Sequence, residues 1–233
     1  MGRIEARLTE LGMKGKVARI SLLRNIRDAV REAARSDAST IIAVGNDQTL
    51  SEVLNALPDF STVLGFIPIP PDSFFGDLLG IPPQEFACDI LANRIIQQLD
   101  VGQVGERYFL AGVELQKQPD ELECDHSFRI HPMRNYQNVF VYNMAPAALG
   151  PRGTVNPSDG RLAAVVTDQP PFWRQLFGLE PKNPSIISAR HVAIKNANPI
   201  SMRVDHSVTL RGPTSITLTA KKVKMVVGKE RQF

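Results

Sequence analysis

Scarce cysteines and the lack of long apolar runs limit what this chain of 233 residues can be. The two cysteines, Cys88 and Cys124, lie far apart, so neither a disulfide framework nor a C-x-x-C site is expected. Such a composition suits a reducing cytoplasm. No apolar run approaches the roughly 20 residues needed to span a bilayer. Residues 1–12 are charged throughout and lack the apolar core of a signal peptide. These absences predict a cytoplasmic protein.

An excess of one charge is also missing, because 27 Lys and Arg stand against 24 Asp and Glu. The basic residues nevertheless gather at the ends: residues 1–36 hold nine basic and four acidic side chains, and residues 221–233 hold five and one. Basic ends suit a peripheral contact with lipid head groups on an anionic membrane, although ordinary solvated side chains would look the same. Nucleic-acid binding is not expected, since no aromatic-rich basic motif or zinc-finger spacing occurs. A homodimer is among the options.

Apolar periodicity divides the chain, which is 43% hydrophobic, into two parts. In the first part, helical patterns alternate with short apolar runs, which is typical of βαβ units and a parallel sheet. The expected helices are residues 3–11, 22–35, a segment after Thr49, and 83–98. The expected strands are residues 16–21, 41–45 and 63–67.

The second part, from Arg107 on, consists of short strand patterns separated by turn residues. The candidates are residues 107–115, 123–131, 139–144, 162–167, 191–195, 202–204, 208–211 and 216–219. They predict an antiparallel, sandwich-like domain. An apolar helix at residues 171–178 is expected to cover the sandwich, with anchoring on lipid as the alternative. The expected domains are residues 1–105 and 106–233, with the C-terminal tail able to return to the first.

The stretch of residues 40–57 predicts a strand, a tight loop and the start of a helix. Its apolar run ends at Gly45, and the loop GNDQT follows. Thr49 and Glu52 have the T-x-x-E spacing of a capping box. In open α/β sheets, ligands bind at such places because free helix amides and the helix dipole favour an anion. A capped helix without any ligand is the alternative.

This stretch resembles the G-G-D-G-T-x-N-E motif of the diacylglycerol kinase-like family, which includes bacterial lipid kinases and sphingoid-base kinases. Four residues match: Gly45, Asp47, Thr49 and Glu52. Asn46 and Gln48 stand at glycine positions; asparagine tolerates a left-handed backbone, but Gln48 brings a long side chain into the place of a phosphate. The resemblance implies an α/β parallel-sheet domain of the NAD-kinase and diacylglycerol-kinase type, followed by an antiparallel β-sandwich-like domain. It also implies that ATP and Mg²⁺ bind, with the nucleotide held by residues 45–47, Thr49 and Glu52, and that Asp47 acts in catalysis.

Three later segments extend the resemblance. Residues 68–82 are similar to the family's second nucleotide loop at both ends, and Asp72 is a candidate ligand beside two prolines that cannot donate hydrogen bonds. Asp100, in LDVGQVGERYF, matches an aspartate that the resemblance places near the catalytic cleft. Asp159, in NPSDG, matches a D-G-x-L segment that helps to hold a structural magnesium. An Asp-Gly hairpin turn would give the same pattern.

Residues 205–207 align with the family's D-G-E segment, whose glutamate is the proposed general base. Asp205 is kept, but His206 and Ser207 replace the glycine and the glutamate. A serine cannot accept a proton at neutral pH as a carboxylate can. His206, with an ordinary pKa of about 6.5, is therefore the candidate base.

Residues 124–131 contain side-chain types that bind metals: Cys124, Asp125, His126 and His131. On a strand, only Cys124 and His126 would share a face. Two ligands are fewer than the three or four that zinc uses, so a solvated strand edge is expected instead.

The resemblance extends from Arg3 to Val227 and lacks only the family's first strand with its N-P-x-S/A-G phosphate loop. A truncated form or a rebuilt sheet is therefore expected. We predict a divergent lipid kinase-like protein whose ATP-dependent phosphotransfer is weak or lost, because both nucleotide loops and the base are altered. The alternative is a non-catalytic module that binds a nucleotide, a lipid or a protein on the same fold.

Overall fold

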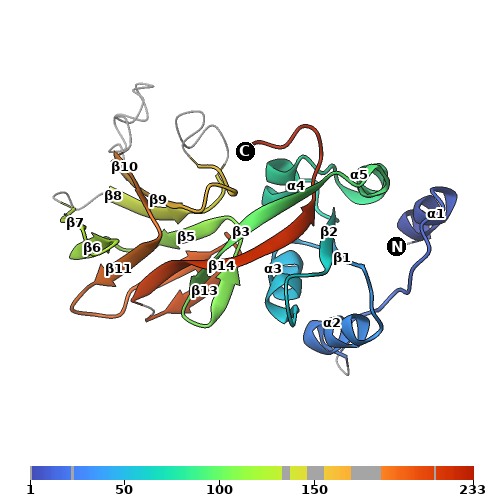
Figure 1. The fold of residues 1–233 in the computed structure, drawn as a ribbon, viewed down its shortest axis with the longest axis horizontal. Coiled ribbons are helices and arrows are strands. Elements are labelled where there is room, and N and C mark those ends of the chain that lie inside the picture. The colour runs from blue at the N-terminus through green and yellow to red at the C-terminus, as the bar shows by residue number, and fades with distance from the viewer. Residues whose placement is uncertain (1, 22–23, 133–136, 146–154, 169–184, 213) are drawn as a thin grey trace. The chain divides into compact units, whose positions relative to one another are not determined.

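The computed structural model describes residues 2–21, 24–132, 137–145, 155–168, 185–212 and 214–233 (Figure 1). The chain forms two compact units. Unit 1 comprises Met1–Leu99 together with Lys221–Phe233, and unit 2 comprises Asp100–Ala220. The C-terminal residues therefore pack with the N-terminal part of the chain.

Unit 1 surrounds a short parallel sheet with helices. Strand β1 (Thr40–Gly45) pairs in parallel with β2 (Val63–Pro68), and β2 pairs in parallel with the end of β14 (Ser215–Val226). All six residues of β2 are buried, as its unbroken apolar sequence predicts. The helices are α1 (Gly2–Glu10), α2 (Ile26–Arg35), α3 (Asp47–Ala56), α4 (Phe74–Leu79), the 3₁₀ helix η1 (Gln84–Phe86) and α5 (Ala87–Asn93).

Two predicted helices of unit 1 are shorter than expected. Helix α2 begins at Ile26 because the side chain of Asn25 caps it and accepts from the amide of Asp28. The predicted helix at 83–98 ends at Asn93, since Arg94 has a φ of 52° and β3 begins at Ile96. The strand predicted at 16–21 is wrong: those residues form no strand beyond one isolated bridge.

Unit 2 is a sandwich of two sheets. In one sheet, the strands follow each other in the order β14, β11 (His191–Lys195), β6 (Glu121–Cys124) and β7 (Phe128–Ile130). Strand β3 (Ile96–Val104) also pairs with β14 and, on its other side, with β4 (Arg107–Phe109). The other sheet is antiparallel. Its strands, in spatial order, are β10 (Ser185–Ala189), β9 (Leu162–Asp168), β8 (Gln137–Tyr142), β5 (Gly112–Leu115), β12 (Ser201–Val204) and β13 (Val208–Arg211).

Side chains of both sheets meet in one core of unit 2. Leu122 and Val192 come from one sheet, and Val113 and Met202 come from the other. The predicted fold class, a parallel-sheet domain followed by an antiparallel sandwich, is therefore confirmed. The helix predicted at 171–178 lies outside the described residues.

Two strand predictions of unit 2 need correction, and strand β10 is an addition to them. Residues 107–115 form two strands, because the backbone leaves the ladder at Leu110 and Ala111. Residues 123–131 also form two strands, separated by a turn at Asp125 and His126. Strand β10, with the sequence SIISA, was not predicted, since its short run has no clear alternation.

The C-terminal tail completes unit 1. The amides of Gly228 and Gln232 donate to the carbonyls of Leu79 and Leu78, at 2.8 and 3.1 Å. Gly228 lies directly against the backbone of Gly80, where a Cβ would collide with the carbonyl of Gly80. Glycine is therefore required at this crossing.

In the part of the chain that the structure describes, no helix is both long and apolar enough to cross a membrane.

Candidate functional site

The loop after β1 is fixed by a reciprocal cap. Asn46 is the N-cap of α3, and its Oδ1 accepts from the amide of Thr49 at 3.0 Å. The Thr49 hydroxyl in turn accepts from the amide of Asn46 at 3.4 Å. The capping box thus starts three residues before the predicted pair of Thr49 and Glu52, and Glu52 lies further along the helix. At Gly45, a Cβ would collide with the side chain of Thr49, so the glycine permits this close packing.

The Asp47 carboxylate is held by the segment that begins α4. Its Oδ1 accepts from the Ser73 hydroxyl at 2.6 Å and from the amide of Phe75 at 3.2 Å. Its Oδ2 accepts from the amide of Phe74 at 3.0 Å. A carboxylate at a helix N-terminus is stabilised by free amides and by the helix dipole. Asp47, one of the four matched residues of the predicted nucleotide motif, therefore links the two loops that follow β1 and β2.

The loop after β2 has few amides left for a phosphate. The amide of Ile69 donates to the carbonyl of Gly45 at 2.8 Å, and Pro70 and Pro71 have no N–H. Beyond them, Phe74 and Phe75 donate to Asp47, and Gly76 donates to the Ser73 hydroxyl at 3.0 Å. Asp72 is exposed to solvent. Since a phosphate cradle needs convergent free amides, these six positions contribute none to such a cradle.

The described part of the chain contains no cluster of metal-ligating side chains. Among the residues that the structure describes, no three acidic, histidine or cysteine side chains come together. Mg²⁺ is commonly held by one or two carboxylates together with water and substrate phosphates.

In unit 2, Asp100 and the predicted Asp159 turn are neighbours. Asp100 is 2% exposed, and its Oδ2 accepts from the amide of Gly160 at 2.8 Å. Its own amide donates to the carbonyl of Pro157 at 2.6 Å. The carboxylate of Asp159 accepts from the amide of Arg161 at 2.9 Å. Both carboxylates thus hold the Asp-Gly turn, and no third ligand joins them within the described part of the chain.

Asp205 is buried and binds three consecutive amides. Its carboxylate accepts from Leu110, Ala111 and Gly112, at 2.8 to 3.3 Å. Burial raises the pKa of Asp205 from 3.8 to about 6, although the three amides act in the opposite direction. This carboxylate holds the break between β4 and β5.

His206, the candidate base, is exposed at the tip of the turn between β12 and β13. It has a φ of 55° and follows Asp205, whose φ is 48°. The amide of Ser207 closes this turn on the carbonyl of Val204 at 3.1 Å. We call residues 205–207 the second D-H-S turn.

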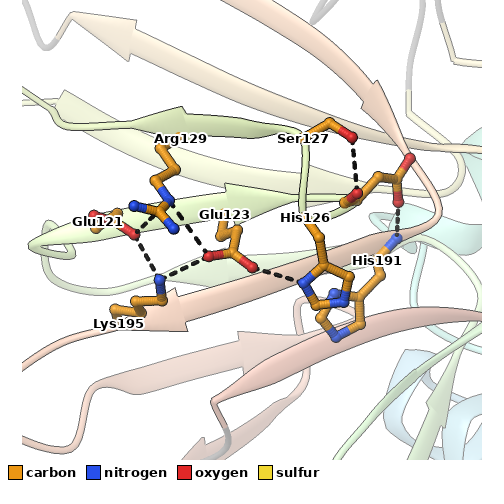
Figure 2. A network of polar contacts seen from close by, with 8 residues as sticks. Glu121, Glu123, His126, Ser127, Arg129, His191 and Lys195 are labelled. Carbon is orange, nitrogen blue, oxygen red and sulfur yellow. Dashed lines mark hydrogen bonds and ion pairs between the residues drawn. The ribbon is translucent and has the colours of Figure 1, made fainter.

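The same triplet forms a turn at residues 125–127, which we call the first D-H-S turn (Figure 2). Asp125 and His126 have φ values of 49° and 56°, and the amide of Ser127 donates to the carbonyl of Cys124 at 3.0 Å. The Asp125 Oδ1 accepts from the amides of Arg190 and His191, at 2.9 and 2.8 Å. Each turn thus fastens the start of a neighbouring strand.

A network of charges lies beside the first turn (Figure 2). Lys195 Nζ is 2.8 Å from Glu121 and 2.7 Å from Glu123, and the Nδ1 of His126 is 2.7 Å from Glu123. The hydrogen bonds from Lys195 and then His126 lower the pKa of Glu123 to about 2. The rings of His126 and His191 stack with centroids 5.2 Å apart. Cys124, at the end of β6, is buried.

Sequence reasoning missed two polar groups that organise these sites. Ser73 caps α4 and binds Asp47, and a serine three residues before a glycine gave no capping signal. Asn143 is fully buried, and its Nδ2 donates to the carbonyls of Asp100 and Leu110 at 2.8 and 2.7 Å. Its only signal was a polar residue directly after an apolar strand.

The first part of the chain is similar in sequence to known proteins. Residues 1–104 match the diacylglycerol kinase catalytic domain family. A diacylglycerol kinase of Bacillus subtilis is 38% identical over 86 residues, which are 35% of this chain and 28% of that protein. One of Staphylococcus saprophyticus is 34% identical over 91 residues, or 36% and 30% of the two chains. The match therefore spans less than a third of these relatives' length.

Solved structures match along nearly the whole chain. A diacylglycerol kinase structure from Bacillus anthracis has a TM-score of 0.75 at 18% identity, covering 99% of this chain and 91% of that one. An Archaeoglobus fulgidus NAD kinase in complex with ATP has a TM-score of 0.59 at 13% identity, covering 99% and 90%. The fold is thus the one shared by diacylglycerol kinases and NAD kinases. The first 104 residues are thus similar to the diacylglycerol kinase catalytic domain, and the whole chain shares the fold of these kinases.

Proposed function

We propose that this chain is a diacylglycerol kinase-like protein in which ATP-dependent phosphorylation of lipids is weak or lost. The observation that carries the proposal is the set of contacts made by Asp47. Its carboxylate accepts three hydrogen bonds from residues 73–75, at 2.6 to 3.2 Å. Two of the donors, the amides of Phe74 and Phe75, would otherwise be available to a phosphate.

Phosphoryl transfer depends mainly on positioning and on electrostatic stabilisation of the transferred group. Here the second loop carries two prolines where free amides are needed, and a buried Asp205 is followed by an exposed histidine and a serine. Loss of one positioned base typically lowers the rate by about 10²- to 10⁴-fold. Weak phosphate binding adds to that loss, although the two effects need not multiply.

The second candidate function is a non-catalytic module that binds a nucleotide, a lipid or a protein. The first turn of α3 favours it over complete loss of binding. Asn46 satisfies the amides of Thr49 and Leu50. Asp47 and Gln48 are the first two residues of this ten-residue helix, where backbone amides have no partner within the helix. A nucleotide bound there should have a Kd no tighter than about 1 mM.

The test is transfer of radiolabelled phosphate from ATP to a panel that includes diacylglycerols and sphingoid bases. We expect no turnover above background for the wild-type chain. Calorimetry with Mg-ATP should show at most millimolar binding, and Asn46→Gly/Gln48→Gly should tighten it. Asp77→Asn is the matched control for Asp47→Asn, because Asp77 lies in the same region, is exposed and was not assigned to the nucleotide site. Turnover near one per second that is lost in Asp47→Asn and kept in Asp77→Asn would contradict the proposal.

A further inference from the structure

Unit 1 exposes a basic surface that takes no part in the candidate site. Residues 13–35 contain seven Lys and Arg and only two acidic residues, a net charge of +5. Residues 14–20 are all exposed and belong to no helix or strand. Together with α2 they form what we call the basic strip, consisting of residues 14–20 and 24–35.

Three arginines of α2 form one row on the outside of the helix. Arg27, Arg31 and Arg35 follow each other at intervals of four residues, which places them on one face. All three are exposed, while Ala29 and Val30 form the buried face. Among the described residues, no carboxylate lies within ion-pair distance of this row. The charges are therefore available to a partner.

Ion pairs place the extended segment beside the two helices. Lys16 Nζ lies 3.9 Å from Glu32 of α2, and the Arg24 guanidinium lies 2.6 Å from the same carboxylate. Arg19 lies 3.5 Å from Glu5 of α1. The cations of the segment and those of α2 thus belong to one continuous surface.

Two apolar side chains project from this surface. Val17 is 56% exposed and Ile20 is 50% exposed, so each gains from any apolar environment that it enters. They lie between Lys16 and Arg19 and next to Arg19, respectively. Clustered cations with interspersed apolar side chains suit the interface of an anionic bilayer, where charges meet phosphate head groups and apolar groups reach the acyl boundary.

We propose that the basic strip binds anionic membrane surfaces, with Val17 and Ile20 entering the interface. Charge complementarity supports a membrane, and the apolar side chains favour it over nucleic acid, because a single-stranded nucleic-acid site would need aromatic side chains for base stacking. The strip has none among its described residues. The inference rests on the proposed function only in taking a lipid surface as the partner, and its test uses neither ATP nor turnover.

The experiment is co-sedimentation with phosphatidylcholine vesicles, with and without phosphatidylglycerol, in the absence of nucleotide. We expect binding only to the anionic vesicles, and its loss at high salt. Arg27→Gln/Arg31→Gln/Arg35→Gln should weaken binding on the order of 100-fold, since each basic residue near such a surface contributes about fivefold. Val17→Ser/Ile20→Ser should weaken it by about tenfold while keeping every charge.

The matched control is Lys117→Gln/Arg211→Gln/Lys229→Gln, which removes the same number of charges from exposed positions elsewhere. We expect it to bind like the wild-type chain. An equal loss in both triple variants would overturn the proposal, since overall charge alone would then explain binding. Equal binding to neutral vesicles would also overturn it, as would a preference for RNA or DNA over the anionic vesicles. Circular dichroism of each variant excludes unfolding as the cause.

Discussion

The two D-H-S turns have the same sequence and the same backbone but different surroundings. Both place Asp and His at φ values between 48° and 56°, and both use the aspartate to accept amides at the start of a neighbouring strand. Asp125, in the first turn, binds two amides and remains partly exposed. Asp205, in the second, binds three and is completely buried.

The difference shows that sequence sets the shape of these turns and burial sets their electrostatics. Burial raises the pKa of Asp205 to about 6. Beside the first turn, hydrogen bonds from Lys195 and His126 lower the pKa of Glu123 to about 2. The pKa values of two carboxyl groups in the same β-rich unit are thus shifted in opposite directions. A carboxylate that matches a catalytic motif therefore does not by itself indicate a catalytic environment.

The largest expected difference between the turns follows removal of the aspartate. Asp205→Ala leaves three buried amides without their acceptor, and we expect the free energy of unfolding to fall by about 3–5 kcal/mol. Asp125→Ala exposes its amides to water and should cost about 1 kcal/mol. Urea unfolding of the two variants measures both values. Equal losses would show that burial does not separate the two turns.

The second expected difference is in pH dependence. Because the pKa of Asp205 is about 6 in the folded protein and 3.8 ordinarily, its contribution to stability is fully present below pH 3.8 and is lost as the pH rises through 6. The loss amounts to about 3 kcal/mol. Asp205→Asn should therefore flatten the stability profile in this window.

Glu123→Gln serves as the opposite control. The pKa of Glu123 is lowered from 4.5 to about 2, so its contribution is present above pH 4.5 and is lost as the pH falls toward 2. The substitution should change the profile only on this acid side. If Asp205→Asn leaves the slope of the unfolding free energy between pH 3.8 and pH 6 unchanged, the Asp205 carboxylate is not the group that titrates there.

The smallest expected difference concerns the two histidines. Both D-H-S turns have a positive φ at Asp and at His, as the two central residues of type I′ turns do. Such turns favour Asp-Gly, because glycine adopts a positive φ without the cost that other residues bear. His206→Gly should stabilise the protein by about 1 kcal/mol. His126→Gly should gain less, since it also loses the contact with Glu123 and the stacking on His191. Thermal unfolding of both variants decides, and a larger gain at position 126 would contradict this explanation.

The twin turns also show what sequence reasoning could and could not predict. Residues 202–204 and 208–211 are predicted as separate strands on either side of the second D-H-S turn. Residues 123–131 are predicted as one strand, although they contain the same D-H-S triplet. Comparing the two occurrences would have placed the first turn. Periodicity predicted β2 and α3 well because their apolar residues are buried by regular neighbours. It failed at Arg94, where a positive φ ends α5, because no pattern marks such a residue.

The candidate site was less predictable than the fold. Motif matches selected Asp47, Asp100 and Asp205, and the structure shows that all three accept hydrogen bonds from backbone amides. Which atoms a carboxylate meets depends on residues distant in sequence, such as Ser73 for Asp47. The lone Asp159-Gly160 pair could be assigned to a turn from local chemistry, and its link to Asp100 could not.

The path of β14 has a consequence for synthesis of the protein. Unit 2 is one continuous segment, whereas unit 1 needs Lys224 and Met225 to extend its parallel sheet beside β2. A ribosome makes those residues after all of unit 2. Unit 2 can therefore fold while β14 is still being completed, but unit 1 waits with one side of β2 unpaired until Lys224 and Met225 emerge. During that interval, the open edge of this buried strand is exposed to wrong pairing, and the end of β14 then closes it.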